Sequence, residues 1–320
     1  MADNGEVRLV EDFEGAVKLY SDGSVVRAAE PSWGSQEDNY VKNVSYKDVV
    51  FEEEIGLWAR LYLPQTDKGE AQLPVLLYFH GGGFCLATPA SPVMHRMCLR
   101  WAAKLGAIIV SVNYRLTPEN RLPAAYEDAI AALQWLHNMK NDGAVGDPWL
   151  RSRADFSKIF VMGESAGGNI AHHVGLWVGA AGMEMGMEIK GMILVYPFFG
   201  GEDRMRSEEA APSMFRVEQS DVMWRMALPV GSNRDHPFCN PVGEWTESAD
   251  SSVSLSPILF VIAGHDILRD KQLQYCEVLK KCGQEVGVVL FEEEDHGFTL
   301  MKVEDQSSVE LLCRISDFIK

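Results

Sequence analysis

Short apolar runs alternate with helical patterns over most of this chain, and this alternation limits the folds open to it. The runs are short and continuously apolar, as expected for strands buried on both faces of a sheet. Strands and helices in alternation predict an α/β fold with a mostly parallel sheet covered on both faces. The expected buried strands are Val75–Phe79, Ala107–Val112, Ile159–Met162, Met192–Tyr196, Ile258–Ala263 and Val286–Phe291, and the expected helices span about 91–105, 123–138, 166–180, 270–282 and 304–319.

Other segments depart from this alternation. Val41–Glu53 and Leu57–Leu63 have a strand-like pattern that fits an antiparallel pair. Residues 1–40 are polar and irregular, with a turn signal at Asp22-Gly23-Ser24, and residues 200–235 form a charged insertion. We expect one domain over residues 1–320, with a cap built from about 1–40 and about 200–235. The insertion has a Met and Trp stripe that fits helix packing and substrate lining equally well: Met205, Met214, Met223, Trp224 and Met226.

Gly163-Glu164-Ser165-Ala166-Gly167 is a G-x-S-x-G pentapeptide between an expected strand and an expected helix. A serine on such a sharp turn is exposed in a strained conformation. The glycines keep side chains away from the neighbouring strand and helix, and the helix N-terminus favours developing negative charge. The pentapeptide alone is a weak signal, but its place between strand and helix makes Ser165 the predicted nucleophile.

A glycine-rich segment, His80-Gly81-Gly82-Gly83-Phe84, follows the expected strand Val75–Phe79. Successive glycines allow backbone N–H groups to point at a negatively charged oxygen. We expect the N–H groups of Gly82, Gly83 and Ala166 to form an oxyanion hole. A flexible strand-exit loop is the simpler alternative, and the G-x-S-x-G turn downstream argues against it.

The partners of such a serine follow it in the order acid, then histidine. Asp266 comes just after the expected strand Ile258–Ala263, and His296 comes just after Val286–Phe291. Both lie at carboxyl ends of strands, where open α/β sheets place their sites. We predict that His296 is the general base for Ser165 and that Asp266 orients its imidazole.

Other titratable residues are weaker candidates. Asp270 is expected inside the following helix, and Asp295 fits a surface acid. His172 and His173 are consecutive in an expected helix, so their side chains point in different directions and make a poor metal pair. The chain shows no metal-ligand spacing and no phosphate loop, so we expect neither a metal nor a cofactor.

Charge and cysteine content restrict the classes of binding partner and the cellular compartment that we expect for this chain. The net charge of −17, from 46 acidic against 29 basic residues, opposes binding to nucleic acid and to anionic membrane surfaces. No apolar run of about 18 residues predicts a membrane span, and the first residues lack a signal-peptide pattern. The six scattered cysteines fit free thiols in a reducing compartment. We expect a cytoplasmic protein, and a nuclear location is also compatible with the sequence. We expect it to be a monomer or a weak homodimer.

With these motifs assembled, the chain resembles the plant carboxylesterases of the hormone-sensitive-lipase group of α/β-hydrolases. The resemblance spans roughly residues 45–320. It implies an eight-stranded, mostly parallel sheet, an N-terminal cap over the active site, and hydrolysis of carboxylic esters without a cofactor. It rests on His80–Phe84, on Asn113–Ala125, on Gly163–Asn169, and on the surroundings of Asp266 and His296.

Relatives in this group differ in function, and residues of this chain bear on the difference. Gibberellin receptors replace the triad histidine with an apolar residue, whereas this chain has His296. Hydroxyisoflavanone dehydratases can carry threonine at the nucleophile position, whereas this chain has Ser165. The chain departs from the family's usual Ala, His and Asp at Thr117, Asn120 and Glu164.

We therefore expect an ester hydrolase that acts through an acyl-enzyme on small to medium ester or lactone metabolites. Phe84, Glu164, Trp224 and Phe298 are the expected substrate-binding residues. Two alternatives stay open: a receptor-like binding protein of the strigolactone or gibberellin type, and a lyase or dehydratase that reuses the triad.

Overall fold

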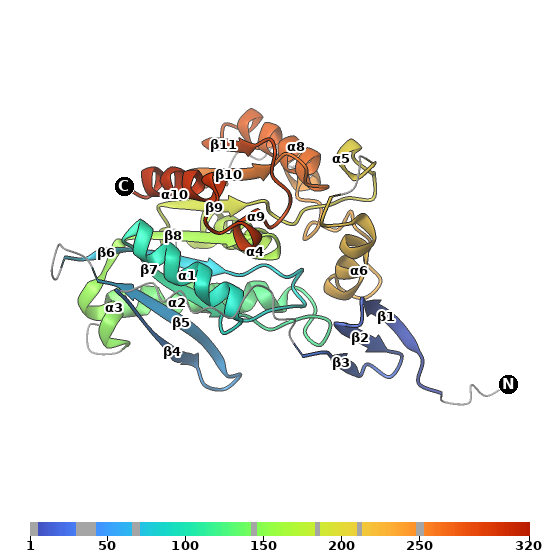
Figure 1. Cartoon of the computed structure of the whole chain (residues 1–320), viewed down its shortest axis with the longest axis horizontal. Coiled ribbons are helices and arrows are strands. Elements are labelled where there is room, and N and C mark those ends of the chain that lie inside the picture. Colours follow the sequence, from blue (N-terminus) through green and yellow to red (C-terminus); the bar gives the residue numbers. More distant parts are fainter. Residues whose placement is uncertain are drawn as a thin grey trace.

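In a computed structural model of the chain, eight strands form the central sheet (Figure 1). Their order is β11–β10–β9–β8–β6–β7–β5–β4. The strands from β11 to β7 run parallel, whereas β5 pairs antiparallel with both β7 and β4. The predicted mostly parallel, eight-stranded sheet is confirmed. The strands are β4 (Val44–Glu52), β5 (Leu57–Pro64), β6 (Leu73–Phe79), β7 (Ile108–Asn113), β8 (Ala154–Glu164), β9 (Gly191–Val195), β10 (Ile258–Ala263) and β11 (Val286–Phe291).

The structure describes residues 6–29, 43–65, 71–141, 146–182, 186–209, 213–247 and 253–320. Parts of the expected cap (1–5, 30–40 and 210–212) and the start of the strand expected from Val41 lie outside these ranges. Within them, no helix has the length and apolar character needed to cross a membrane.

Side chains of the central strands alternate between two hydrophobic cores, one on each face of the sheet. On β6, Val75, Leu77 and Phe79 belong to one core, and Leu76 and Tyr78 belong to the other. Because both faces are covered, these strands are apolar throughout, which is the pattern that predicted them. Helices α2 (Ala124–Asn141), α4 (Ala166–Trp177) and α8 (Arg269–Lys281) cover the first core, and α1 (Pro92–Leu105) and α10 (Gln306–Phe318) cover the second.

The expected helices are observed with shifts of a few residues at their ends, and local chemistry explains the limits of α1. Pro92 occupies the first turn, where its missing N–H is not needed, and Gly106 ends the helix in the left-handed conformation with φ 60°. The remaining helical elements are α3 (Pro148–Arg153), the π-helical η1 (Val178–Gly182), α5 (Arg206–Glu209), α6 (Val217–Ala227), α7 (Val242–Glu247) and α9 (Phe298–Met301).

The expectation of an irregular N-terminal segment is wrong for the described residues. Three strands, β1 (Leu9–Phe13), β2 (Val17–Tyr20) and β3 (Val25–Arg27), form an antiparallel sheet of their own. Glu14 and Gly15 turn between β1 and β2 with φ of 49° and 75°, values that suit a tight hairpin. Because only Phe13 and Val17 of these strands are buried, the sequence has too little apolar alternation to reveal them.

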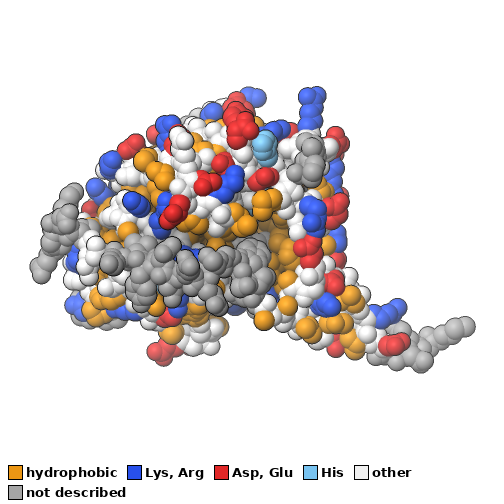
Figure 2. All heavy atoms as spheres, viewed as in Figure 1, with side chains coloured by type: hydrophobic (Ala, Val, Ile, Leu, Met, Phe, Trp, Pro, Cys, Tyr) orange, Lys and Arg blue, Asp and Glu red, His pale blue; other side chains and the backbone are white. Residues whose placement is uncertain are grey.

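The small N-terminal sheet lies beside helix α6 of the insertion (Figure 1). The Arg225 guanidinium binds both carboxylate oxygens of Glu11, at 2.6 and 2.9 Å. Gln219 donates to Glu14 at 3.0 Å, and Arg216 pairs with the same carboxylate. Figure 2 shows acidic and basic side chains interspersed along the edge formed by these elements. The two segments that interrupt the strand–helix alternation therefore contact each other.

The loops that follow β10 and β11 approach closely at Gly264. A Cβ atom at this position would lie 2.0 Å from the backbone oxygen of Glu292, which no side-chain motion can relieve. We predict that Gly264→Ala lowers the free energy of unfolding by about 1–3 kcal/mol, the usual cost of overpacking. Urea unfolding followed by circular dichroism measures the change.

The matched control is Gly243→Ala in α7, where a Cβ would meet no atom of the described residues within 4 Å beyond its own neighbours in the helix. Alanine is the better helix former, so this variant should be unchanged or slightly more stable. Equal stabilities for the two variants would contradict the close approach at Gly264.

Candidate active site

Ser165 lies on the sharp turn that joins β8 to α4. Its φ of 52° and ψ of −121° are strained values for a residue with a side chain, and they persist only where the surroundings enforce them. A Cβ at Gly163 would lie 2.0 Å from the Gly167 oxygen, and one at Gly167 would lie 1.9 Å from the Phe79 oxygen. Both glycines are therefore required by close backbone contacts, as the pentapeptide predicts.

The structure joins Ser165, His296 and Asp266 in one hydrogen-bonded chain. Nε2 of His296 lies 2.9 Å from Oγ of Ser165, and Nδ1 of His296 lies 2.7 Å from Oδ2 of Asp266. The other carboxylate oxygen of Asp266 accepts the Leu268 N–H at 2.9 Å. With Nδ1 donating to the carboxylate, Nε2 is left to accept the serine proton, which is the arrangement that acyl transfer requires.

The two rival acids are engaged elsewhere. Asp270 accepts the Ser207 N–H and pairs with its neighbour Arg269. Asp295 accepts from the Ser213 hydroxyl at 3.1 Å. Neither carboxylate is bonded to the imidazole.

The glycine-rich loop after β6 borders the same pocket as the serine. Gly82 and Gly83 have φ of 107° and 59°, values that favour glycine. Within the described residues, the amides of Gly82, Gly83 and Ala166 donate to no backbone acceptor outside helices and strands. Backbone amides without a protein acceptor can bind a negatively charged oxygen, and an oxyanion hole formed by these three amides stays a prediction.

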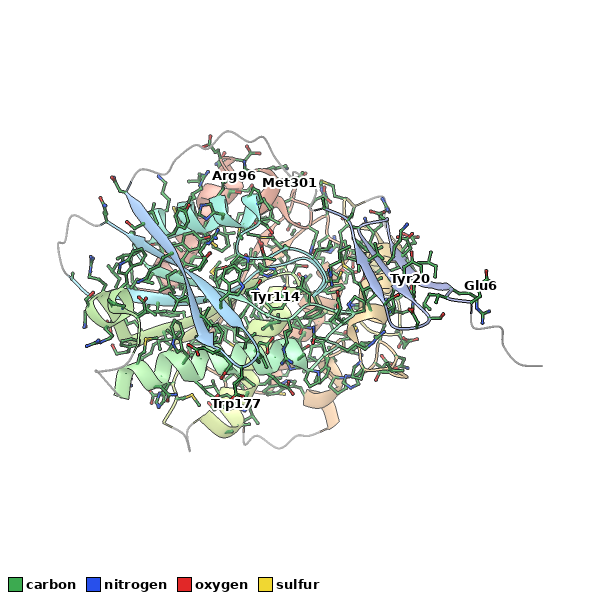
Figure 3. The ribbon with its side chains drawn as sticks, turned by 90° about the horizontal axis from the view of Figure 1, so that it is seen from below. Glu6, Tyr20, Arg96, Tyr114, Trp177 and Met301 are labelled. Atoms are coloured by element: carbon green, nitrogen blue, oxygen red, sulfur yellow. The ribbon has the colours of Figure 1, made fainter. Side chains whose placement is uncertain are left out.

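His80 and Tyr114 support this loop from below, a role that the motif alone did not reveal. The two rings stack with centroids 4.4 Å apart, and the Tyr114 hydroxyl donates to the His80 carbonyl at 2.8 Å. Tyr114 is labelled near the centre of Figure 3. Burial lowers the pKa of His80 to about 4, so its imidazole is neutral at physiological pH.

A pocket of about 220 Å³ opens at Ser165, and several parts of the chain besides the serine turn and the glycine-rich loop form its walls. Phe13 belongs to β1, Phe215 and Met223 to the insertion, and Leu300 to α9. Phe215 stacks on the His296 ring at 4.8 Å, although nothing in its sequence context singles it out. The pocket is mostly apolar, as sites for small organic ligands usually are.

Three of the expected substrate-binding residues require correction, because they do not line this pocket. Phe84 and Trp224 are fully buried with ring centroids 5.6 Å apart, and Phe298 is packed against Phe291 on the other side of the sheet. The Met and Trp stripe divides between both roles. Met214 lines the pocket, Trp224 and Met226 belong to the core, and Met223 does both.

Glu164 also differs from the expectation, because its side chain has no exposed surface. The residue borders the pocket, but its carboxylate accepts hydrogen bonds from Tyr78 at 3.0 Å, Tyr196 at 2.8 Å and Thr299 at 2.9 Å. These donors come from β6, from the end of β9 and from α9, three residues after His296. Glu164 therefore ties the segment that carries Ser165 to the segment that carries the imidazole.

Among the residues that the structure describes, no group of three or more His, Cys, Asp or Glu side chains is arranged to hold a metal ion. His172 bonds the Tyr275 hydroxyl at 2.6 Å, while His173 stacks on Tyr126. Burial lowers the pKa of both imidazoles, so both are neutral at physiological pH.

The buried carboxylate gives a stability prediction. Glu164→Ala leaves three buried hydroxyls without their acceptor, at about 1–3 kcal/mol for each unsatisfied group. We expect it to lose at least about 2 kcal/mol of unfolding free energy, and Glu164→Gln to lose less because the amide keeps the shape and one acceptor. Urea unfolding of both variants beside the wild type measures this difference. Equal losses would contradict the hydrogen-bonding role.

The burial of Glu164 also predicts how the difference in unfolding free energy between the wild type and Glu164→Gln changes with pH. Burial raises the pKa of Glu164, against the opposing effect of its hydroxyl donors, so the native state binds the proton more tightly than the unfolded state does. The stability of the wild type relative to Glu164→Gln should therefore be greatest at low pH and should decline as the pH rises through the native pKa. A difference that grows with pH would be inconsistent with this environment.

Known proteins are similar to this chain along most of its length. Residues 76–300 match the family described as having the alpha/beta hydrolase fold. Probable carboxylesterase 6 of Arabidopsis thaliana is 35% identical, over 97% of this chain and 91% of that protein. The gibberellin receptor GID1C of Arabidopsis thaliana is 37% identical over 82% of this chain and 77% of its own. The 2-hydroxyisoflavanone dehydratase of Glycyrrhiza echinata is 35% identical over 95% of this chain and 94% of that protein.

A solved structure gives the same result for the fold. The hyperthermophilic esterase from the archaeon Pyrobaculum calidifontis superposes with a TM-score of 0.72 at 28% identity, covering 86% of this chain and 85% of that one. The sheet order, the serine turn and the matched residues 76–300 agree with one another. The chain therefore belongs to the α/β-hydrolase family.

Proposed function

We propose that this protein is a carboxylesterase that hydrolyses small to medium uncharged esters or lactones through an acyl-enzyme on Ser165. The observation that carries the proposal is the hydrogen-bonded chain from Ser165 through His296 to Asp266 at the floor of an apolar pocket. The carboxylesterase among its relatives and the esterase with a similar structure support it.

In the proposed acylation step, Oγ of Ser165 attacks the ester carbonyl while Nε2 of His296 takes the serine proton. Asp266 holds the imidazole in the required tautomer and stabilises its positive charge. The negative charge that develops on the carbonyl oxygen is bound by the amides of Gly82, Gly83 and Ala166. His296 then gives its proton to the alcohol oxygen, and the alcohol leaves.

Deacylation repeats the same proton transfers with water in place of the serine hydroxyl. His296 takes a proton from the water, the water oxygen attacks the acyl carbonyl, and Ser165 recovers its proton as the acid is released. Every proton moves between groups of this chain, water and substrate. The proposed mechanism therefore needs no cofactor, and the proposed partner is the ester itself.

The receptor and lyase alternatives predict different chemistry at the same residues. A receptor without turnover has no need of the 2.9 Å contact between His296 and Ser165, which therefore favours an enzyme. A lyase would release an acid without adding water. Hydrolysis in heavy-oxygen water should place one labelled oxygen in the product acid, and an unlabelled acid would favour the lyase.

The direct test compares the wild type with Ser165→Ala on p-nitrophenyl acetate and butyrate. Loss of the nucleophile should lower kcat/KM by at least about a thousandfold, because only binding and the oxyanion donors remain. His296→Ala should lower it similarly, since residues of a triad act as a unit.

The matched control is Ser232→Ala, an exposed serine outside the pocket, which should keep full activity. Equal background rates for the wild type and Ser165→Ala would contradict a general esterase and favour a receptor, a lyase or a hydrolase with a very narrow substrate.

A further inference from the structure

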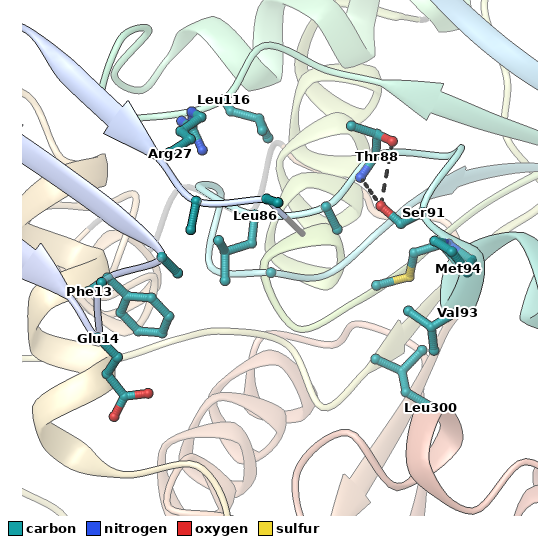
Figure 4. Close-up of a pocket in the computed structure, with 17 residues that line it drawn as sticks. Phe13, Glu14, Arg27, Leu86, Thr88, Ser91, Val93, Met94, Leu116 and Leu300 are labelled. Carbon is teal, nitrogen blue, oxygen red and sulfur yellow. Dashed lines mark hydrogen bonds between the residues drawn. The ribbon is translucent and has the colours of Figure 1, made fainter. Parts of the chain in front are cut away.

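A second and larger cavity lies beside the catalytic pocket, between the N-terminal sheet and the start of α1 (Figure 4). Its volume is about 620 Å³, against about 220 Å³ for the catalytic pocket. Sites for drug-sized ligands usually measure about 300–1,000 Å³, so the catalytic pocket alone is small for such a ligand and the second cavity is not. We call this second cavity the side chamber. Figure 4 shows Phe13 and Leu86 on one side of it and Val93, Met94 and Leu300 on the other.

The side chamber adjoins the catalytic pocket. They share five wall residues: Phe13, Glu14, Gly82, Leu86 and Leu300. Gly82 is one of the three proposed oxyanion donors. A carbonyl oxygen bound there would lie at the junction, and one arm of the ester could extend from the junction into the side chamber.

The polar groups around the side chamber are already paired within the protein. The Arg27 guanidinium binds both carboxylate oxygens of Glu119, at 2.9 and 2.6 Å, and donates to the Thr117 carbonyl at 2.7 Å. Glu14 is bound by Gln219 and Arg216. No charge in this set is left to recognise an ion, and the remaining walls are mostly apolar, so the chamber suits an uncharged apolar group.

The geometry of the proposed reaction indicates which arm of the ester fits there. The leaving alcohol takes its proton from His296, so the alcohol side of the ester lies at the imidazole. Phe215 and Gly297, which contact or adjoin His296, line the catalytic pocket and not the side chamber. The shared wall at Gly82 and Leu86 lies on the side of the oxyanion donors instead.

We propose that the side chamber binds the acyl arm of the substrate, so that the preferred esters join an extended apolar acyl group to a compact alcohol. This inference rests on the proposed function. It assigns selectivity for the acid portion to residues of the N-terminal sheet and of the loop before α1, far from the triad in sequence.

The test fills the chamber from two independent sides. Ala16→Trp does so from the N-terminal sheet, and Leu116→Trp does so from the body of the protein. For each variant, kcat/KM is measured on p-nitrophenyl octanoate and p-nitrophenyl acetate. The ratio of the two values should fall at least about tenfold in both variants, because the longer acyl chain loses its apolar contacts.

The control is Val26→Trp, on the outer surface of β3, which does not line the chamber and should leave the ratio unchanged. Titration of the active serine with a phosphonate counts competent sites, so a partly unfolded variant cannot imitate a change in selectivity. If neither filled variant changes the ratio while acetate is still turned over, the acyl assignment is wrong.

A second pair of substrates separates the two arms of the ester. The ratio of kcat/KM for octyl acetate to that for ethyl acetate should be the same in both filled variants as in the wild type. The two esters share a short acyl group and differ only in the length of the alcohol. A fall in this ratio, with the octanoate ratio unchanged, would place the alcohol in the chamber and overturn the inference. Absence of Ser165-dependent turnover on every ester would instead contradict the proposed function.

Discussion

The close backbone contact between the serine turn and strand β6 is the constraint on which the site depends. Gly167 lies so near the Phe79 carbonyl that any side chain would overlap it, and this contact accompanies the strained φ of Ser165. Phe79 pairs in register with Gly163, so the glycine-rich loop and the serine leave neighbouring parallel strands side by side. The same logic holds for β10 and β11, whose parallel register brings the loops of Asp266 and His296 together.

The chemistry and the shape of the pocket come from different parts of the chain. Ser165, Asp266, His296 and the glycine-rich loop all follow the ends of parallel strands, so a rigid sheet positions the groups to which the proposed function assigns the triad and the oxyanion hole. The N-terminal sheet supplies Phe13, and the insertion supplies Phe215, just before α6, and Met223, within α6. Ion pairs and hydrogen bonds at the surface join the N-terminal segment to α6. Relatives named as esterases, a hormone receptor and a dehydratase share this fold, which fits a scaffold whose function is set in the pocket.

Sequence patterns predicted an element correctly where a single strong physical constraint determines its residues. Ile258–Ala263 and Val286–Phe291 were predicted with the observed bounds. Strand β10 is buried throughout, as its continuously apolar sequence predicts. The expectation that Val286–Phe291 is buried is wrong, because β11 is an edge strand in which only Phe291 is buried. The need for glycine at positions 163 and 167 was also predicted correctly from the pentapeptide. The sheet β1–β3 was missed because its strands are mostly exposed, and Phe84, Trp224 and Phe298 were misplaced because an aromatic residue near a motif can face the core as readily as the pocket. The hydroxyl cluster around Glu164 joins residues far apart in sequence, so no local pattern could show it.

The covalent intermediate is the central claim of the proposed mechanism, and acid quenching of the enzyme during turnover of a slowly deacylated ester tests it most directly. Peptide mass spectrometry of the quenched protein should find the acyl group on the peptide that contains Ser165, formed at least as fast as the steady-state rate and absent from Ser165→Ala. Turnover by the wild type with no acyl group on Ser165, or with acylation at another residue at the catalytic rate, would contradict the account.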